Sequence, residues 1–179
     1  HEAGGWRVHT DKCDIRARVV VNAAGVYADE IHNLVAAPDD QLVISPRRGQ
    51  YYVLDTAVDG YVRHTVFSLP TKLGKGVLVT PTTAGNILVG PTAEDIEDKE
   101  GVDTTFDGIG EVRRKCSITM KDVPLNHSIR TFSGLRAHQP GHDFVIGEVV
   151  GAPGFVDCAA IESPGLSAAP AVGLMVADI

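Results

Sequence analysis

Two segments, one near each end of the chain, run from apolar residues through a turn of small residues into a helical pattern. In the first segment, strands are predicted over residues 4–9 and 16–21, joined by a polar turn at residues 10–12. The continuous run Val19-Val20-Val21 is typical of a strand covered on both faces, because both alternating sets of side chains are apolar. The pattern therefore predicts a hairpin whose second strand enters a buried sheet.

The turn Asn22-Ala23-Ala24-Gly25 follows this second strand. After it, apolar residues recur at helical spacing and predict one apolar helix face, made of Tyr27, Ile31, Leu34 and Val35. Asp29 and Glu30 fall in the first turn of this helix, where the helix dipole favours negative charge. Pro38 and the acidic pair after it are expected to end the helix.

The middle of the chain has a different pattern of short β-rich runs broken by Gly, Pro, Asp and Asn. The predicted strands are residues 42–44, 50–54, 61–69, 76–82 and 86–89. Residues 83–86 form a tight connection, so the last two strands are expected to pair as an antiparallel hairpin. After an acidic surface loop at residues 94–103, apolar residues recur at helical spacing and predict a helix packed on the sheet. These residues are Phe106, Ile109, Val112, Cys116 and Met120.

The last part of the chain returns to strands and ends in a helix. Strands are predicted at residues 126–139, 143–149 and 154–157, and the helix at residues 164–178. Proline suits the first turn of a helix, and Ser163 is in position to be its N-cap.

These elements predict an α+β fold with an inserted domain. Residues 1–45 and 144–179 are expected to form one domain. Residues 46–143 are expected to form the inserted domain, an antiparallel sheet with one main helix. No internal repeat interrupts this organisation.

Composition and charge narrow the function classes. The formal net charge is −7, which disfavours unaided nucleic-acid binding, because phosphate contacts need clustered Lys and Arg. Hydrophobic residues make up 44% and charged residues 22%, a balance that excludes extensive disorder. Cys13, Cys116 and Cys158 are far apart in sequence and are interpreted as small buried hydrophobes in a reducing, cytoplasmic compartment. Neither the cysteines nor the histidines have metal-ligand spacing, so no metal site is predicted.

Five sequence blocks together indicate a family. In order along the chain they are VVVNAAGVYADEI, SPRRGQYYVLD, LVTPTTAGNILVGPTAED, TFSGLRAHQPGHDFVIGE and IESPGLSAAPAVG. The chain resembles the FAD-dependent oxidoreductases of the D-amino acid oxidase superfamily, nearest to glycerol-3-phosphate dehydrogenase-like and 2-hydroxyglutarate oxidase-like members. The resemblance implies that residues 1–45 and 144–179 are part of a Rossmann-like FAD-binding domain, and that residues 46–143 form the substrate-binding domain.

The resemblance also implies two cofactor contacts. The first is the turn Asn22-Ala23-Ala24-Gly25, where small residues let the backbone approach the FAD closely. The second is Ser163-Pro164-Gly165-Leu166-Ser167, whose backbone N–H groups would face the pyrimidine edge of the flavin. Because that edge becomes negative on reduction, a helix N-terminus there would stabilise it. Without a ligand, the same residues are an ordinary strand-to-helix turn and a capped helix.

Arg136 is the residue that the resemblance assigns to the substrate's carboxylate or phosphate, since its planar fork suits bidentate anion binding. Arg48 is a second candidate, and Arg47 and Arg130 could join it. His127 and His138 are candidate catalytic bases, because histidine can accept a hydroxyl proton near neutral pH. Each is alternatively a structural histidine. Gly90-Pro91-Thr92 is interpreted either as a rigid turn or as a substrate contact.

The expected function is the transfer of a hydride from a secondary alcohol of a small anionic substrate to FAD. Glycerol 3-phosphate is the first choice of substrate, and a quinone or another carrier would accept the electrons. The alternatives are a 2-hydroxyglutarate or other 2-hydroxy acid oxidase, an amino-acid oxidase, and a non-catalytic substrate-binding fragment. The protein is expected to be cytoplasmic or peripheral to a membrane.

The dinucleotide fingerprint G-x-G-x-x-G, which normally follows the first strand of such a domain, does not occur in the chain. The chain is therefore expected to be the C-terminal part of a larger enzyme, inactive by itself and without bound FAD. A homodimer formed through a strand edge left exposed by such a truncation is compatible with this expectation.

Overall fold

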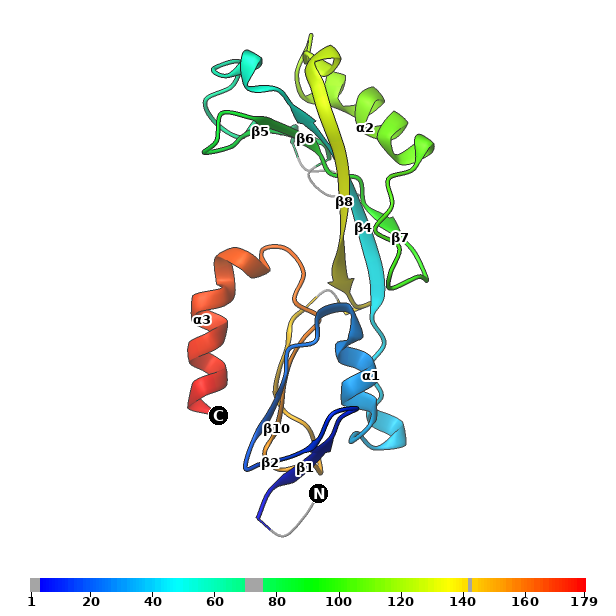
Figure 1. The fold of residues 1–179 in the computed structure, drawn as a ribbon, viewed down its shortest axis with the longest axis vertical. Helices are drawn as coiled ribbons and strands as arrows, with labels where there is room; N and C mark the ends of the chain where they lie inside the picture. The colour runs from blue at the N-terminus through cyan, green and yellow to red at the C-terminus, as the bar shows by residue number, and fades with distance from the viewer. Residues whose placement is uncertain (1–3, 70–75, 142) are drawn as a thin grey trace. The chain divides into compact units, whose positions relative to one another are not determined.

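The computed structural model describes residues 4–69, 76–141 and 143–179, and it has the expected α+β architecture (Figure 1). The chain divides into two compact units. Unit 1 contains the chain up to Pro46 and again from Arg136 to Ile179, and unit 2 is the continuous segment Arg47–Leu135. Residues 136–141 and 143, which the sequence analysis grouped with the inserted domain, therefore belong with the terminal segments. The physical reason is that Ala137 packs with Ala28, Ile44 and Ala159 of unit 1.

Unit 1 contains two small sheets. β1 (Trp6–His9) and β2 (Asp14–Ala17) form the predicted antiparallel hairpin. The second sheet has the order β3-β10-β9, with β3 (Val20–Asn22) parallel to β10 (Phe155–Ala159) and β9 (Val145–Glu148) antiparallel to it. Trp6 packs edge-on against Phe155, with ring centroids 5.4 Å apart, and so joins the two sheets.

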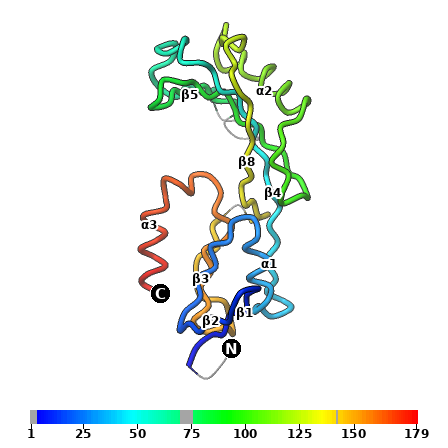
Figure 2. Tube along the Cα trace, in the orientation of Figure 1, coloured from blue at the N-terminus to red at the C-terminus, as the bar shows by residue number. Residues whose placement is uncertain are grey.

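The helices of unit 1 follow its two parallel strands. After β3 the chain forms a short 3-10 turn (Gly25–Tyr27) and α1 (Ala28–Asn33), and a second 3-10 turn lies at Pro38–Asp40. After β10 it forms α3 (Gly165–Asp178), as the path of the chain in Figure 2 shows. Parallel strands each followed by a helix place both strand-to-helix turns at the same edge of the sheet.

Unit 2 is an antiparallel sheet with one long helix. Its strands are β4 (Ser45–Leu54), β5 (Leu78–Pro81), β6 (Ile87–Gly90), β7 (Glu94–Asp95) and β8 (Ser128–His138). The first two residues of β4 and the last three of β8 belong to unit 1. The strand order is β5-β6-β4-β7, and β8 also pairs with β4. Short 3-10 turns lie at Thr56–Val58 and Leu125–His127.

The core of unit 2 forms where α2 (Phe106–Thr119) covers β5 and β6. The buried cluster consists of Leu54, Val62, Val77, Val79, Ile87, Val89, Val112 and Cys116. The hairpin between β5 and β6 and the buried positions Val112 and Cys116 confirm the prediction for this region. The first residue of the predicted helix stripe is wrong, because Phe106 is 94% exposed and Gly108 faces the sheet instead.

Several predicted elements of unit 1 are wrong in detail. The strand predicted at residues 16–21 is two strands, because its first part pairs with β1 and its last part with β10. The buried face of α1 is polar at Asp29 and His32, while Leu34 is 78% exposed. Ser163 is not an N-cap: Pro164 holds that position, and no side chain among the described residues caps α3.

Two predicted strands of the middle segment do not form. Residues 42–44 are held against α1 by side chains, since the Asn33 amide bonds to the backbone of Leu42 and Asp29 Oδ2 accepts from the Ile44 N–H. Residues 61–69 make one isolated bridge, between Val66 and Val79. None of the helices in the described parts of the chain is both long and apolar enough to cross a membrane.

Candidate cofactor and substrate site

The turn Asn22-Ala23-Ala24-Gly25, called here the first turn, is held from inside by the Asn22 side chain. Asn22 Nδ2 donates to the Ala28 carbonyl and to Asp157 Oδ1, both at 2.8 Å, and Oδ1 accepts from the Ala24 N–H at 3.4 Å. Asn22 is 3% exposed, whereas Ala23 and Ala24 are exposed. Gly25 has φ of 60°, a backbone conformation that favours glycine. The outer surface of the turn thus carries nothing larger than a methyl group at these positions.

His32 continues this polar contact into α1. Its Nδ1 donates to Asp157 Oδ2 at 2.5 Å, and its Nε2 donates to the Asp40 carbonyl at 2.6 Å. A carbonyl oxygen only accepts, so both ring nitrogens carry protons when both bonds form with an ionised Asp157. Burial, the largest influence, opposes the charge, but the Asp40 carbonyl and the Asp157 carboxylate together outweigh it and raise the pKa of His32.

We expect the protein to lose stability as the pH rises through the raised pKa of His32. The folded-state pKa lies above the unfolded value of about 6.5, so the His32 contribution is fully present below that value and is lost above the folded-state pKa. The pH dependence of the free energy of unfolding is measured by urea unfolding of the wild type and of Asp157→Asn between about pH 6 and 9. Only the wild type should show the decline, and parallel profiles would exclude His32 as the titrating group.

The second turn, residues 163–167, connects β10 to α3. Ala160 follows β10 with φ of 53° and is 1% exposed, and the Gly165 N–H donates to the Glu162 carbonyl at 2.6 Å. A Cβ on Gly165 would lie 2.5 Å from Ile161 Cγ2. The Ile161 side chain therefore requires a glycine at this position, whether or not a cofactor is bound. Ser163, Pro164, Leu166 and Ser167 are exposed.

The structure brings the two turns to one apolar hollow of about 280 Å³. Its lining residues are Val21, Ala23, Cys158, Ile161, Gly165, Ala169, Val172, Gly173 and Val176. Ala23 belongs to the first turn and Gly165 to the second, so the two predicted cofactor segments share one surface. Burial raises the pKa of the Cys158 thiol, with a smaller effect of the Asp157 charge, which keeps this group neutral and apolar in character.

The end of β8 lies against the second turn. His138 is buried, and its Nδ1 is 3.2 Å from Oε1 of Glu162, the residue just before Ser163. Arg136 is half-buried two residues earlier on the strand. Because side chains alternate along a strand, Arg136 and His138 lie on the same face of β8, the face that meets Glu162.

The other predicted site residues lie in unit 2. His127 is exposed in the 3-10 turn before β8. In unit 2, Arg48 is 11% exposed and donates through Nε and Nη2 to Glu94 Oε2. Arg47 forms a bidentate pair with Asp95. A substrate anion at either arginine would compete with a carboxylate that is already bound.

Thr92 of the Gly90-Pro91-Thr92 block is also engaged within unit 2. It is 2% exposed, its Oγ1 accepts from the Gln50 N–H at 3.0 Å, and it donates to the Arg48 carbonyl at 3.3 Å. These bonds tie the segment after β6 to β4. They support the rigid-turn interpretation of this block.

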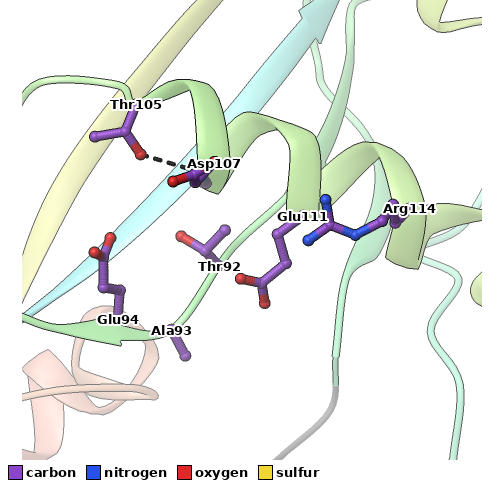
Figure 3. Close-up of a pocket in the computed structure, with 8 residues that line it drawn as sticks. Thr92, Ala93, Glu94, Thr105, Asp107, Glu111 and Arg114 are labelled. Carbon is purple, nitrogen blue, oxygen red and sulfur yellow. Dashed lines mark hydrogen bonds between the residues drawn. The ribbon is translucent and has the colours of Figure 1, made fainter.

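A second hollow, of about 270 Å³, lies beside α2 in unit 2 (Figure 3). Its charged lining residues are Glu94, Asp107, Glu111 and Arg114. Three carboxylates against one guanidinium make it a poor site for a small anion. Among the described residues, no group of three or more His, Cys, Asp or Glu side chains could hold a metal ion.

The family model for FAD dependent oxidoreductases, DAO, matches residues 1–179. The chain belongs to the DAO family. A glycerol 3-phosphate dehydrogenase from Caloramator mitchellensis is 49% identical over 175 residues, which are 98% of this chain and 36% of that protein. A glycerol 3-phosphate oxidase from Mycoplasma pneumoniae is 34% identical over 169 residues, covering 93% of this chain and 44% of the oxidase. The chain thus spans about two fifths of the length of these relatives.

A solved structure extends the comparison to three dimensions. The dithionite-reduced L-alpha-glycerophosphate oxidase from Mycoplasma pneumoniae, with FAD bound, superposes with a TM-score of 0.81 at 35% identity. The match covers 90% of this chain and 42% of that one. The fold and the cofactor class of this DAO-family chain therefore agree with the sequence analysis.

The residues of unit 1 fit a flavin. The first turn presents methyl groups and backbone over its buried Asn22, and Gly165 at the start of α3 lines the same apolar hollow as Ala23. A flat, largely apolar ring system needs this combination of small side chains and an apolar surface.

Sequence reasoning missed the residues behind the two turns: His32, Asp157 and Glu162. One signal was available, since Asp157 is a lone carboxylate inside the apolar run 155–159. A charge in a buried strand requires a partner. The partner itself, His32, lies 125 positions away and carries no local signature.

Proposed function

We propose that the protein is an FAD-dependent dehydrogenase that oxidises a secondary alcohol of a small anionic substrate, with glycerol 3-phosphate as first choice. The observation that carries the proposal is the 49% identity, across 98% of this chain, to a glycerol 3-phosphate dehydrogenase. The electrons would leave to a quinone or another acceptor. A cytoplasmic protein that reaches the membrane surface would be suited to such an acceptor.

In this proposal the first and second turns would hold FAD, which would supply the acceptor for the hydride. Arg136 binds the substrate phosphate through its planar fork and so orients the substrate. His138 accepts the hydroxyl proton. Glu162, at 3.2 Å, accepts from Nδ1–H and orients the imidazole, so that Nε2 is the nitrogen that takes the proton.

The experiment is turnover of the full-length protein with an artificial dye as electron acceptor. The substrates are glycerol 3-phosphate, 2-hydroxyglutarate, glycine and D-amino acids. We expect flavin absorbance in the purified protein and the highest kcat/KM with glycerol 3-phosphate. Preference for an amino acid would contradict the substrate class. Binding of glycerol 3-phosphate without flavin reduction would favour a non-catalytic binding protein.

A further inference from the structure

A continuous chain of buried polar groups runs behind the first turn. It connects His32 on α1, Asp157 on β10 and Asn22 at the end of β3, which are 5%, 2% and 3% exposed. Asn22 and Asp157 are direct neighbours in the register of the parallel pair β3 and β10. Burying a polar group costs free energy unless the group is hydrogen-bonded. Here each of the three side chains makes at least two hydrogen bonds.

Asn22 sets the backbone path of the first turn. Its amide bonds the Ala24 N–H on one side of the turn and the Ala28 carbonyl, at the start of α1, on the other. The second proton of Nδ2 is held by Asp157 Oδ1 at 2.8 Å. The Asn22 side-chain amide can rotate about the bond to its Cβ. The contact to Asp157 selects the orientation in which Oδ1 accepts from the Ala24 N–H and Nδ2 donates to the Ala28 carbonyl.

Asp157 is in turn fixed by His32. The carboxylate receives Asn22 on one oxygen and His32 on the other, and His32 is anchored at its far side by the Asp40 carbonyl. The three side chains therefore form one rigid path from the 3-10 turn Pro38–Asp40 to the first turn.

We propose that Asp157 is a positioning residue for the flavin: through Asn22 it holds the first turn in the shape that binds FAD. The inference rests on the proposed function, in which this turn contacts the cofactor. Asp157 would thus raise the FAD affinity and influence the flavin's local environment without contacting the cofactor.

Three variants separate positioning from plain stability. Asp157→Asn keeps the path, because the new Oδ1 accepts from Asn22 and the new Nδ2 donates to His32 Nδ1 of the neutral ring, while Nε2 still donates to Asp40. Asp157→Ala removes both contacts, and Asn22→Ala removes the link to the turn. The matched control is Asp29→Asn, which changes a buried carboxylate on α1 that accepts from the Ile44 and Glu30 N–H groups.

The experiment is titration of FAD into the full-length apoprotein of each variant, followed by flavin fluorescence, with the visible absorption and circular dichroism of the bound flavin. Loss of the buried hydrogen bonds of either side chain predicts an FAD Kd raised about 10- to 100-fold for Asp157→Ala and Asn22→Ala, with an altered flavin spectrum. Asp157→Asn should stay within about threefold of the wild type. Asp29→Asn should lower the unfolding midpoint and leave the Kd and spectrum unchanged.

The outcomes distinguish this inference from the proposed function. If the wild type binds FAD and Asp157→Ala binds it equally well, the positioning role is wrong and the proposed function stands. The same conclusion follows if Asp29→Asn weakens FAD binding as much as Asp157→Ala does. A wild type that binds no FAD overturns both proposals. Should Asp157→Ala fail to fold, Asp157→Leu, which fills the site and makes neither hydrogen bond, takes its place in the comparison.

Discussion

Replacing Arg136 with leucine should lower kcat/KM for glycerol 3-phosphate by about 10²- to 10³-fold in the full-length protein. The reason is that a half-buried guanidinium would hold the substrate phosphate with two charge-assisted bonds, and leucine of similar volume offers none. Most of the effect should fall on KM, because the anion is bound before and during the reaction alike. Steady-state kinetics with a dye acceptor measures it.

Two controls accompany the Arg136 variant. Arg136→Lys keeps the charge and loses the planar fork, so it should fall between the wild type and the leucine variant. Arg16→Leu changes an exposed arginine on β2 of the same unit and should leave the kinetics unchanged. An unaltered KM for glycerol 3-phosphate in Arg136→Leu, with full FAD content, would show that the phosphate is bound elsewhere.

Replacing Gly108 with alanine should destabilise the protein by about 1–3 kcal/mol, although alanine is the better helix former by about 1 kcal/mol. A Cβ at this position would collide with the side-chain amide of Gln50, which is fully buried under α2. That amide cannot move cheaply, because it donates to Thr105 Oγ1 at 3.1 Å and accepts from the Thr105 N–H at 2.7 Å. Urea unfolding of the protein, followed by circular dichroism, measures the change in the free energy of unfolding.

The same helix supplies the control for Gly108. A Cβ on Gly110 would meet the far end of the Arg114 side chain at 3.4 Å, which can shift. Gly110→Ala should therefore be neutral or stabilising by up to about 1 kcal/mol. Equal destabilisation by both substitutions would mean that helix backbone effects, and not the Gln50 contact, decide the stability here.

Elements whose signals are local could be predicted from the sequence. The β5–β6 hairpin follows from the turn residues between two β-rich runs, and α2 follows from the spacing of Val112 and Cys116. The two small-residue turns could also be located, because each is a change from strand to helix pattern within a few residues. The family blocks then supplied the cofactor class, which periodicity alone could not.

What failed depends on partners distant in sequence. The face of α1 was assigned from apolar periodicity, but its buried side carries Asp29 and His32, whose contacts are Ile44 and Asp157. The split of the strand at residues 16–21 depends on β10, which no local pattern in β3 reveals. Arg48 was a candidate for the substrate anion, and the sequence does not reveal its ion pair because Glu94 is 46 positions away.

The pairing of β3 with β10 also fixes an order of events during protein synthesis. Unit 2 is one continuous segment, whereas Asn22 and Asp157 of unit 1 are 135 positions apart. Domains fold as their segments leave the ribosome, and contacts between distant residues form last. A nascent chain can therefore complete unit 2 before β10 has been synthesised and can pair with β3. The two turns proposed to bind FAD would be the final part to take shape, and a released chain truncated before Phe155 should contain a protease-resistant unit 2 that retains no FAD.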